Sequence, residues 1–165
     1  IDEGEDLLSD VAFCTYWFLE ELFYMAARVD NDDSIKPESF YKQRCFEVVT
    51  KIFEAVYQND DMGFEQLQHL YNLHQGIAGH EANGGKNEDI VRYHLERAME
   101  CCEKSTLVKD HTLTHPMLYG WCVADAPSDN TMNLKLMKKT LAEKSYDDFR
   151  SCEWFQKLES KITAL

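Results

Sequence analysis

The chain has 165 residues, enough for one domain with a substantial core, and its 44% hydrophobic and 12% aromatic content argues against a disordered protein. Only seven glycines and three prolines leave little material for the many turns of an all-β fold. The formal net charge of −13, of which residues 1–38 alone carry −9, excludes direct nucleic-acid binding by this segment, because an acidic surface repels phosphate backbones.

A long first helix is expected over residues 8–29. From residue 11 to residue 27, only Thr15, Glu20 and Glu21 interrupt a run of apolar side chains. A membrane span is excluded because two carboxylates lie in the middle of the run, where each charge costs roughly 2.5–3.5 kcal/mol. A helix that is apolar nearly all round should be buried on more than one side inside the fold, and a dimer interface is the alternative.

A second helix is expected from Pro37 to about residue 57, because proline suits the first turn of a helix. Its expected core stripe follows the helical period through Tyr41, Cys45, Val48, Val49, Ile52 and Val56.

A third helix is expected over residues 62–82. Its expected core stripe consists of Leu67, Leu70, Tyr71, His74, Ile77 and Ala78.

A fourth helix is expected over residues 88–104, with Asn87 as its N-cap. The Asn-Gly-Gly-Lys sequence at 83–86 is a turn, so the third and fourth helices should form an αα-hairpin. Val91, Leu95 and Ala98 are spaced four and then three residues apart, which places them on one face where a neighbouring helix can approach closely. Stacked hairpins usually form binding and assembly surfaces.

The last third of the chain begins with an irregular stretch, residues 105–130, in which Pro116 disfavours a helix. A fifth helix is expected over residues 131–143. Its inward-facing residues should be Leu134, Met137 and Leu141. Residues 145–148 resemble a capping box with Asp in place of Glu, which predicts a sixth helix that ends near residue 163. Its expected buried stripe consists of Phe149, Cys152, Phe155, Leu158 and Ile162.

These elements predict an all-α fold of about six helices in stacked αα-hairpins, within a single domain that spans residues 1–165. The cysteines agree with an intracellular protein. No C-x-x-C pair occurs, and the residues on predicted apolar helix faces include Cys14, Cys45, Cys101 and Cys152. This pattern favours a reducing cytoplasm in which cysteine serves as a small hydrophobe, and a disulfide or metal framework is the alternative.

Two segments resemble a known repeat family. The small residues Gly79, Val91 and Ala98, with the large apolar Leu95, resemble a degenerate tetratricopeptide repeat. Residues 146–158 are similar to the closing helix of bacterial tetratricopeptide-like domains, which end in phenylalanine-arginine, a short spacer, an aromatic residue and a leucine. Together the two segments fall within residues 62–165, and they resemble the C-terminal helical domain of Firmicutes-type regulators whose N-terminus is a Cro/CI-like (Xre) helix-turn-helix.

The resemblance implies a tetratricopeptide-like sensor or dimerisation domain of a bacterial transcription regulator, without catalytic activity or cofactor. We therefore expect a homodimer that binds a peptide, a small ligand or a protein partner, and no membrane association. The chain starts at Ile1 and contains no helix-turn-helix, so we expect a fragment whose DNA-binding part lies outside it.

A binding groove is expected on the side of the third helix that lies away from its core stripe. This face consists of His69, Leu73, Gly76, His80 and Asn83. First helices of stacked hairpins line a concave surface, and histidine and asparagine offer hydrogen bonds to a bound backbone. Trp17, Glu21 and Tyr24 share a face of the first helix and would suit a peptide with a basic group. The alternative is that the face of the third helix packs on the first helix or meets water.

A helical-bundle metalloenzyme is the alternative function, built on His69, His74, His80 and His94. Zinc ligands on a helix usually stand four residues apart, as in H-E-x-x-H, whereas the spacings within the third helix are five and six. We therefore expect no metal site and no catalytic residue.

Overall fold

The computed structural model describes residues 3–32, 40–57, 62–109, 111–112, 118, 122–123 and 129–164. The helices are α1 (Glu3–Asp30), α2 (Phe40–Val56), α3 (Phe64–Asn83), α4 (Glu88–Ser105), α5 (Met132–Leu141), the 3-10 helix η2 (Lys144–Phe149) and α6 (Glu153–Ala164). Two-residue strands β1 (His111–Thr112) and β2 (Cys122–Val123) pair antiparallel, with His111 opposite Val123. The all-α fold is confirmed, because this strand pair is its only sheet within the described residues.

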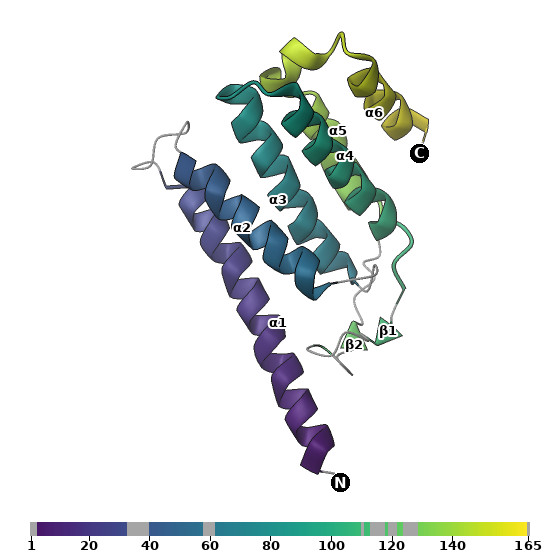
Figure 1. Ribbon diagram of the computed structural model, residues 1–165. Helices are drawn as coiled ribbons and strands as arrows, with labels where there is room; N and C mark the ends of the chain where they lie inside the picture. Colours follow the sequence, from purple (N-terminus) through teal and green to yellow (C-terminus); the bar gives the residue numbers. More distant parts are fainter. Residues whose placement is uncertain are drawn as a thin grey trace.

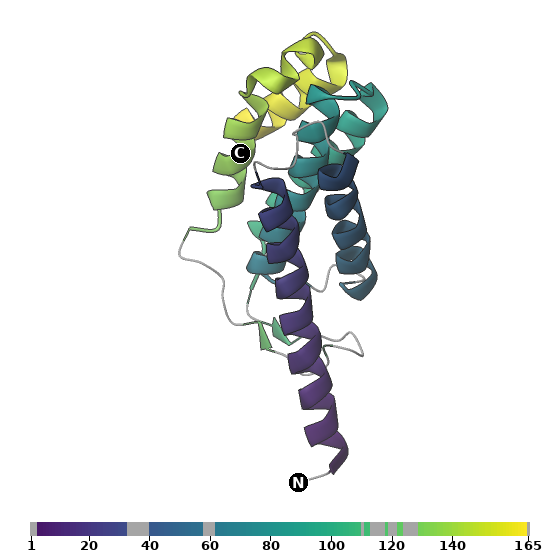
Figure 2. The same cartoon turned by 90° about the vertical axis from the view of Figure 1, so that its left-hand side faces the viewer.

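Consecutive helices contact one another along the chain and run alternately up and down the molecule (Figure 1). The most extensive contact joins α3 to α4, and α2 lies on the other side of α3. At the far end, α6 contacts both α4 and α5. α1 stands at the opposite edge, and its N-terminal turns extend beyond the ends of α2 and α3 in both views (Figures 1 and 2).

The α3–α4 hairpin follows the predicted pattern. Asn87 caps α4, because its side-chain oxygen accepts hydrogen bonds from the backbone N–H groups of Asp89 and Ile90. The close-approach residues Val91, Leu95 and Ala98 are all fully buried. The predicted core stripe of α3, from Leu67 to Ala78, is also buried throughout.

α1 differs from the prediction. Its buried face includes Ala12, Leu19, Phe23 and Ala26, whereas large apolar side chains on the rest of the helix meet solvent. The expectation of burial on more than one side is therefore wrong, because α1 is the edge of the molecule and packs mainly on α2. Cys14 is exposed rather than packed on a core face.

α2 is rotated from the predicted stripe. Its buried face is formed by Phe46, Val49 and Phe53, and the buried Tyr57 follows directly after the helix, while Val48 is 43% exposed. The aromatic side chains explain the rotation, since burying them removes more apolar area from water than burying cysteine and valine does. Pro37 and the side chain of Tyr41 lie outside the described residues.

The C-terminal segment holds one further correction. Residues 144–149 form the separate 3-10 helix η2, and α6 begins only at Glu153. The hydroxyl of Ser145 is buried without a hydrogen-bond partner within the described residues, so the predicted capping box does not form. Most of the predicted inward-facing residues are buried: Leu134, Met137, Leu141, Phe149, Phe155 and Leu158. Cys152 and Ile162, the other two of the predicted stripe, are only half-buried.

Candidate functional site

The predicted groove on α3 is filled by neighbouring helices. Leu73 is fully buried and His69 is 5% exposed. A Cβ on Gly76 would lie 3.1 Å from the ring of Phe46, so α2 covers this face at close range. Asn83 is exposed, and its side chain donates to the backbone carbonyl of Gly79 at 2.9 Å. The residues of this face therefore do not line an open groove.

The aromatic residues expected beside the groove lie on the outer part of α1. Trp17 is 52% and Tyr24 is 47% exposed. Glu21 pairs with Arg28 on the same helix, at 3.5 Å, instead of facing α3. The physical reason is that α1 meets α3 along another side, through polar contacts.

Three polar contacts form a ladder between α1 and α3. The hydroxyl of Tyr16 donates to Glu65 at 3.1 Å, Glu20 lies 3.3 Å from His69, and Asp30 lies 2.8 Å from His80. The sequence separations of the first and last pairs are 49 and 50. A constant separation is expected where two helices run side by side in the same direction, as α1 and α3 do in Figure 1.

His74 and His94, the other two histidines of the alternative metal-site hypothesis, belong to a different network on the other side of α3. His74 and His94 approach with their Nδ1 atoms 2.9 Å apart, and Nε2 of His74 lies 3.5 Å from Glu54. Arg97 donates to the same carboxylate at 3.3 Å. Burial, followed by the charge of His74, lowers the pKa of His94 to about 4. The hydrogen bond from His74 lowers the pKa of Glu54.

The four histidines therefore do not share one site. His69 and His80 are 11 residues apart on α3, about 16 Å along a helix. His74 pairs across to α4 instead. A metalloenzyme built on all four is thus not supported by their positions.

A buried polar cluster surrounds the middle rung of the ladder. Glu20 and His69 are each 5% exposed, and Glu65 is half-buried. One ligand atom from each of the three lies within 4.8 Å of the others, the only such group of three or more His, Cys, Asp or Glu residues in the described part of the chain. Tyr57 is nearly buried, and its hydroxyl has no hydrogen-bond partner among the described residues.

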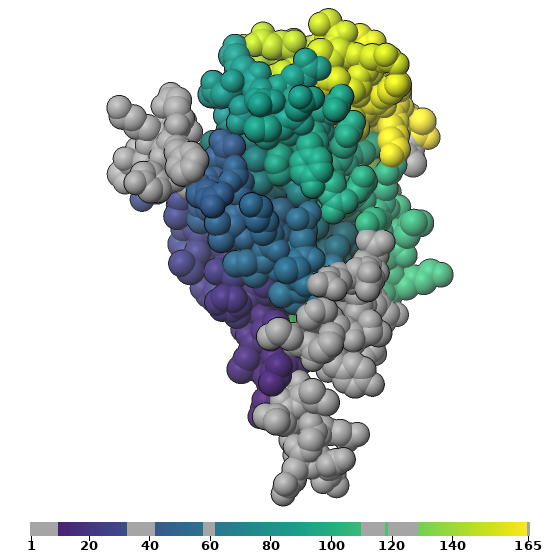
Figure 3. Space-filling view, in the orientation of Figure 1, coloured from purple at the N-terminus to yellow at the C-terminus, as the bar shows by residue number. Residues whose placement is uncertain are grey.

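A line of exposed apolar residues runs along the outside of α1. We call it the α1 seam, and it consists of Val11, Cys14, Phe18, Leu22, Met25 and Val29. Phe18 is 58% and Met25 52% exposed. Val29 is half-buried, and Leu22 is half-buried with part of its side chain against the core. No other described helix lies in front of α1 in Figure 2, and Figure 3 shows α1 along the outer edge of the molecule beside α2. Exposed apolar surface of this extent marks interaction sites.

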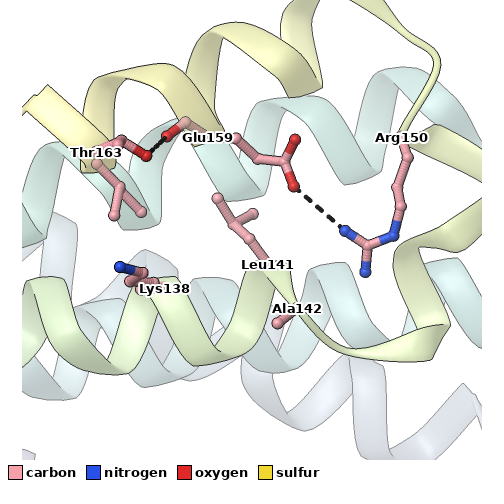
Figure 4. Close-up of a pocket in the computed structure, with 7 residues that line it drawn as sticks. Lys138, Leu141, Ala142, Arg150, Glu159 and Thr163 are labelled. Atoms are coloured by element: carbon pink, nitrogen blue, oxygen red, sulfur yellow. Dashed lines mark hydrogen bonds and ion pairs between the residues drawn. The ribbon is translucent and has the colours of Figure 1, made fainter.

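A pocket of about 220 Å³ opens between α5, α6 and the C-terminal end of η2 (Figure 4). It is lined by Lys138, Leu141, Ala142, Arg150, Glu159, Ile162 and Thr163. The guanidinium of Arg150 already forms two ion pairs, with Glu159 at 3.2 Å and with Asp147 at 2.8 Å. Among the described residues, Lys138 is therefore the lining cation that has no ion pair.

The adjacent thiols of Cys101 and Cys102 are buried and unreactive. Burial raises the pKa of Cys101 to about 12, and it raises that of Cys102 as well. A thiol that stays protonated at neutral pH is a poor nucleophile and a poor metal ligand.

Comparison of the chain with protein-family models, with curated proteins and with solved structures found no match. Within the described residues, no helix combines the length and the apolar character that a bilayer crossing requires. We therefore infer the function from the arrangement of the residues.

Proposed function

We propose that this chain is a non-enzymatic assembly and sensor domain that pairs with a second copy of itself through the α1 seam. The single observation that carries the proposal is the exposure of large apolar side chains along that seam. A folded domain rarely leaves such a line in water, because each fully buried large side chain contributes about 1.5–3 kcal/mol.

The spacing of the seam suits a helix as its partner. Successive seam residues stand three or four positions apart, which keeps them on one side of α1 over residues 11–29. A second helix laid along this line would contact all of them through interlocking side chains.

The seam is also complementary to itself. In an antiparallel pair with Phe18 on the two-fold axis, Val11 lies opposite Met25, and Cys14 lies opposite Leu22. Every seam residue in this range thus meets an apolar residue, which is the requirement for an interface in which both copies use the same surface.

Charge favours the antiparallel arrangement over the parallel one. The first ten residues hold five acidic side chains and no basic one: Asp2, Glu3, Glu5, Asp6 and Asp10. A parallel pair would bring two such segments together, whereas an antiparallel pair separates them along the length of α1.

The role in transcription regulation rests on the sequence resemblance. It is supported by the contacts between consecutive helices and by the close packing of Val91, Leu95 and Ala98, both of which a tetratricopeptide-like stack requires. In this proposal the domain acts in the bacterial cytoplasm, and a separate segment holds the DNA. A peptide or protein partner would bind outside the face of α3, because α1 and α2 cover that face.

Sedimentation velocity over a wide concentration range tests the pairing. We expect the unsubstituted chain to form dimers and Phe18→Glu to be a folded monomer, because the charge would be buried at the two-fold axis. Tyr93→Glu is the matched control, since Tyr93 is a similarly exposed aromatic residue, at 52%, on α4. A monomer at all concentrations, or equal loss of dimer in both variants, would contradict the proposal.

A further inference from the structure

We infer that Glu20, Glu65 and His69 form a binding site for a divalent first-row transition metal ion, with Zn²⁺ as the best-fitting chemistry. The site lies between α1 and α3, on the middle rung of the ladder. It is separate from the α1 seam, so the inference does not depend on the proposed pairing.

The distance between the two most buried groups supports an ion. Nδ1 of His69 lies 3.3 Å from Oε1 of Glu20, yet neither atom has a hydrogen-bond partner within the described residues. Zinc binds nitrogen and carboxylate oxygen at about 2.0–2.2 Å, so two ligand atoms of one tetrahedral ion stand about 3.4 Å apart. The observed separation is therefore that of two ligands.

The other groups around this pair complete the site. Glu65 brings a second carboxylate, with one ligand atom within 4.8 Å of one ligand atom each of Glu20 and His69, and the hydroxyl of Tyr16 donates to that carboxylate at 3.1 Å. Such outer hydrogen bonds orient metal ligands. The ring of Phe23 stacks on His69 with 3.9 Å between centroids, which fixes the plane of the imidazole.

Tyr57 provides a second and independent sign of a ligand. The residue is 3% exposed, and its buried hydroxyl has no hydrogen-bond partner in the described structure. The ring of Phe53 links Tyr57 to the cluster, with its centroid 5.8 Å from that of Tyr57 and 6.2 Å from that of His69. A buried polar group without a partner costs stability, and a metal ion or its bound water would supply that partner.

The ligand chemistry selects the ion. One imidazole and two carboxylates suit zinc, cobalt or manganese, whereas magnesium and calcium prefer sites made of oxygen ligands alone. Two negative carboxylates and a neutral imidazole would leave a net charge of zero around a divalent ion. The ion would then compensate the buried charge of Glu20.

Titration of the tag-free chain with Co²⁺, followed by its visible absorption, tests the site. We expect one equivalent of Co²⁺ to give the d–d bands of a low-symmetry site, Zn²⁺ to displace it, and a hundredfold excess of Mg²⁺ to leave it in place. Glu65→Gln and His69→Gln should each weaken Co²⁺ binding at least tenfold. Because Glu65 is half-buried, Glu65→Gln should stay folded even if His69→Gln does not, and circular dichroism checks this.

His80→Gln is the matched control. His80 also pairs with a carboxylate of α1, that of Asp30, but within the described residues it belongs to no group of three possible metal ligands. It should bind Co²⁺ like the unsubstituted chain. The inference is overturned if the unsubstituted chain does not bind Co²⁺, which would make Glu20 and His69 an ion pair only. It is also overturned if Glu65→Gln binds as tightly as His80→Gln, which would place the ion elsewhere on the acidic surface.

Discussion

Two adjacent residues of α1 provide a direct test of how this helix is oriented. Leu19 is fully buried against the core, whereas Phe18 is 58% exposed on the seam. Substituting each by alanine removes a large apolar side chain from the same turn of one helix. The two costs should differ strongly, because only Leu19 leaves a cavity behind.

The magnitudes follow from burial. Leu19→Ala removes three carbon groups at about 0.8 kcal/mol each, roughly 2.4 kcal/mol, and the residual cavity raises the total to about 3 kcal/mol. Phe18→Ala should change the stability of the monomer by no more than about 0.5 kcal/mol, since the lost contacts are few and alanine is the better helix former.

Urea unfolding followed by far-UV circular dichroism measures both free energies. The protein must be dilute enough to be monomeric, because pairing would add a concentration-dependent contribution at Phe18. Equal costs at the two positions would show that α1 is buried on both sides. A larger cost at Phe18 than at Leu19 would show that α1 is rotated from the orientation described above.

Three further predictions concern other parts of the chain. From pH 7 to pH 5 the free energy of unfolding should fall in the unsubstituted chain by about 1 kcal/mol more than in His94→Gln. The pKa of His94 is lowered in the folded state, so protons bind the unfolded state more strongly once the pH drops below about 6.5. Urea unfolding at both pH values measures the difference. Asn87→Ala should lower stability by about 1 kcal/mol through loss of the α4 cap, measured by the same unfolding, while Asn83→Ala, on the exposed end of α3, serves as its control. Residues 1–165 alone should give no specific DNA mobility shift at physiological salt, and a salt-resistant shift would mean that the acidic surface is not decisive.

The helices were predictable because apolar residues recur at the helical period from one end of the chain to the other. The facing surfaces of α3 and α4 were predictable for the same reason, down to the burial of Val91 and Leu95. The rotation of α2 did not follow from the period alone, because Phe46 and Val48 are both apolar and the period does not choose between them. The larger apolar area of the aromatic side chains favours the face that the structure buries. Likewise, an apolar residue on α1 has the same sequence pattern whether it meets the core or a partner.

The groove was misassigned for a different reason. Histidines on the outer face of α3 were interpreted as exposed, yet their partners lie about 50 residues away on α1. A local pattern cannot show that a buried imidazole has a distant carboxylate. One signal was available: Tyr16, Glu20 and Asp30 precede Glu65, His69 and His80 at a nearly constant separation, as two parallel helices require.

The same ladder explains why the seam faces outward. Successive residues of a helix are turned by about 100°, so Glu20 stands about 160° around α1 from Phe18. Contacts of Glu20 with α3 therefore hold the seam on the opposite side, toward solvent.

A cation bound by Glu20 and His69 would strengthen this orientation of α1 without touching the seam. If cation binding changes the dissociation constant of the dimer, dimer formation must change the affinity for the cation by the same factor. Sedimentation with and without Zn²⁺ measures that factor. Equal constants in the two conditions would show that the two faces of α1 act independently.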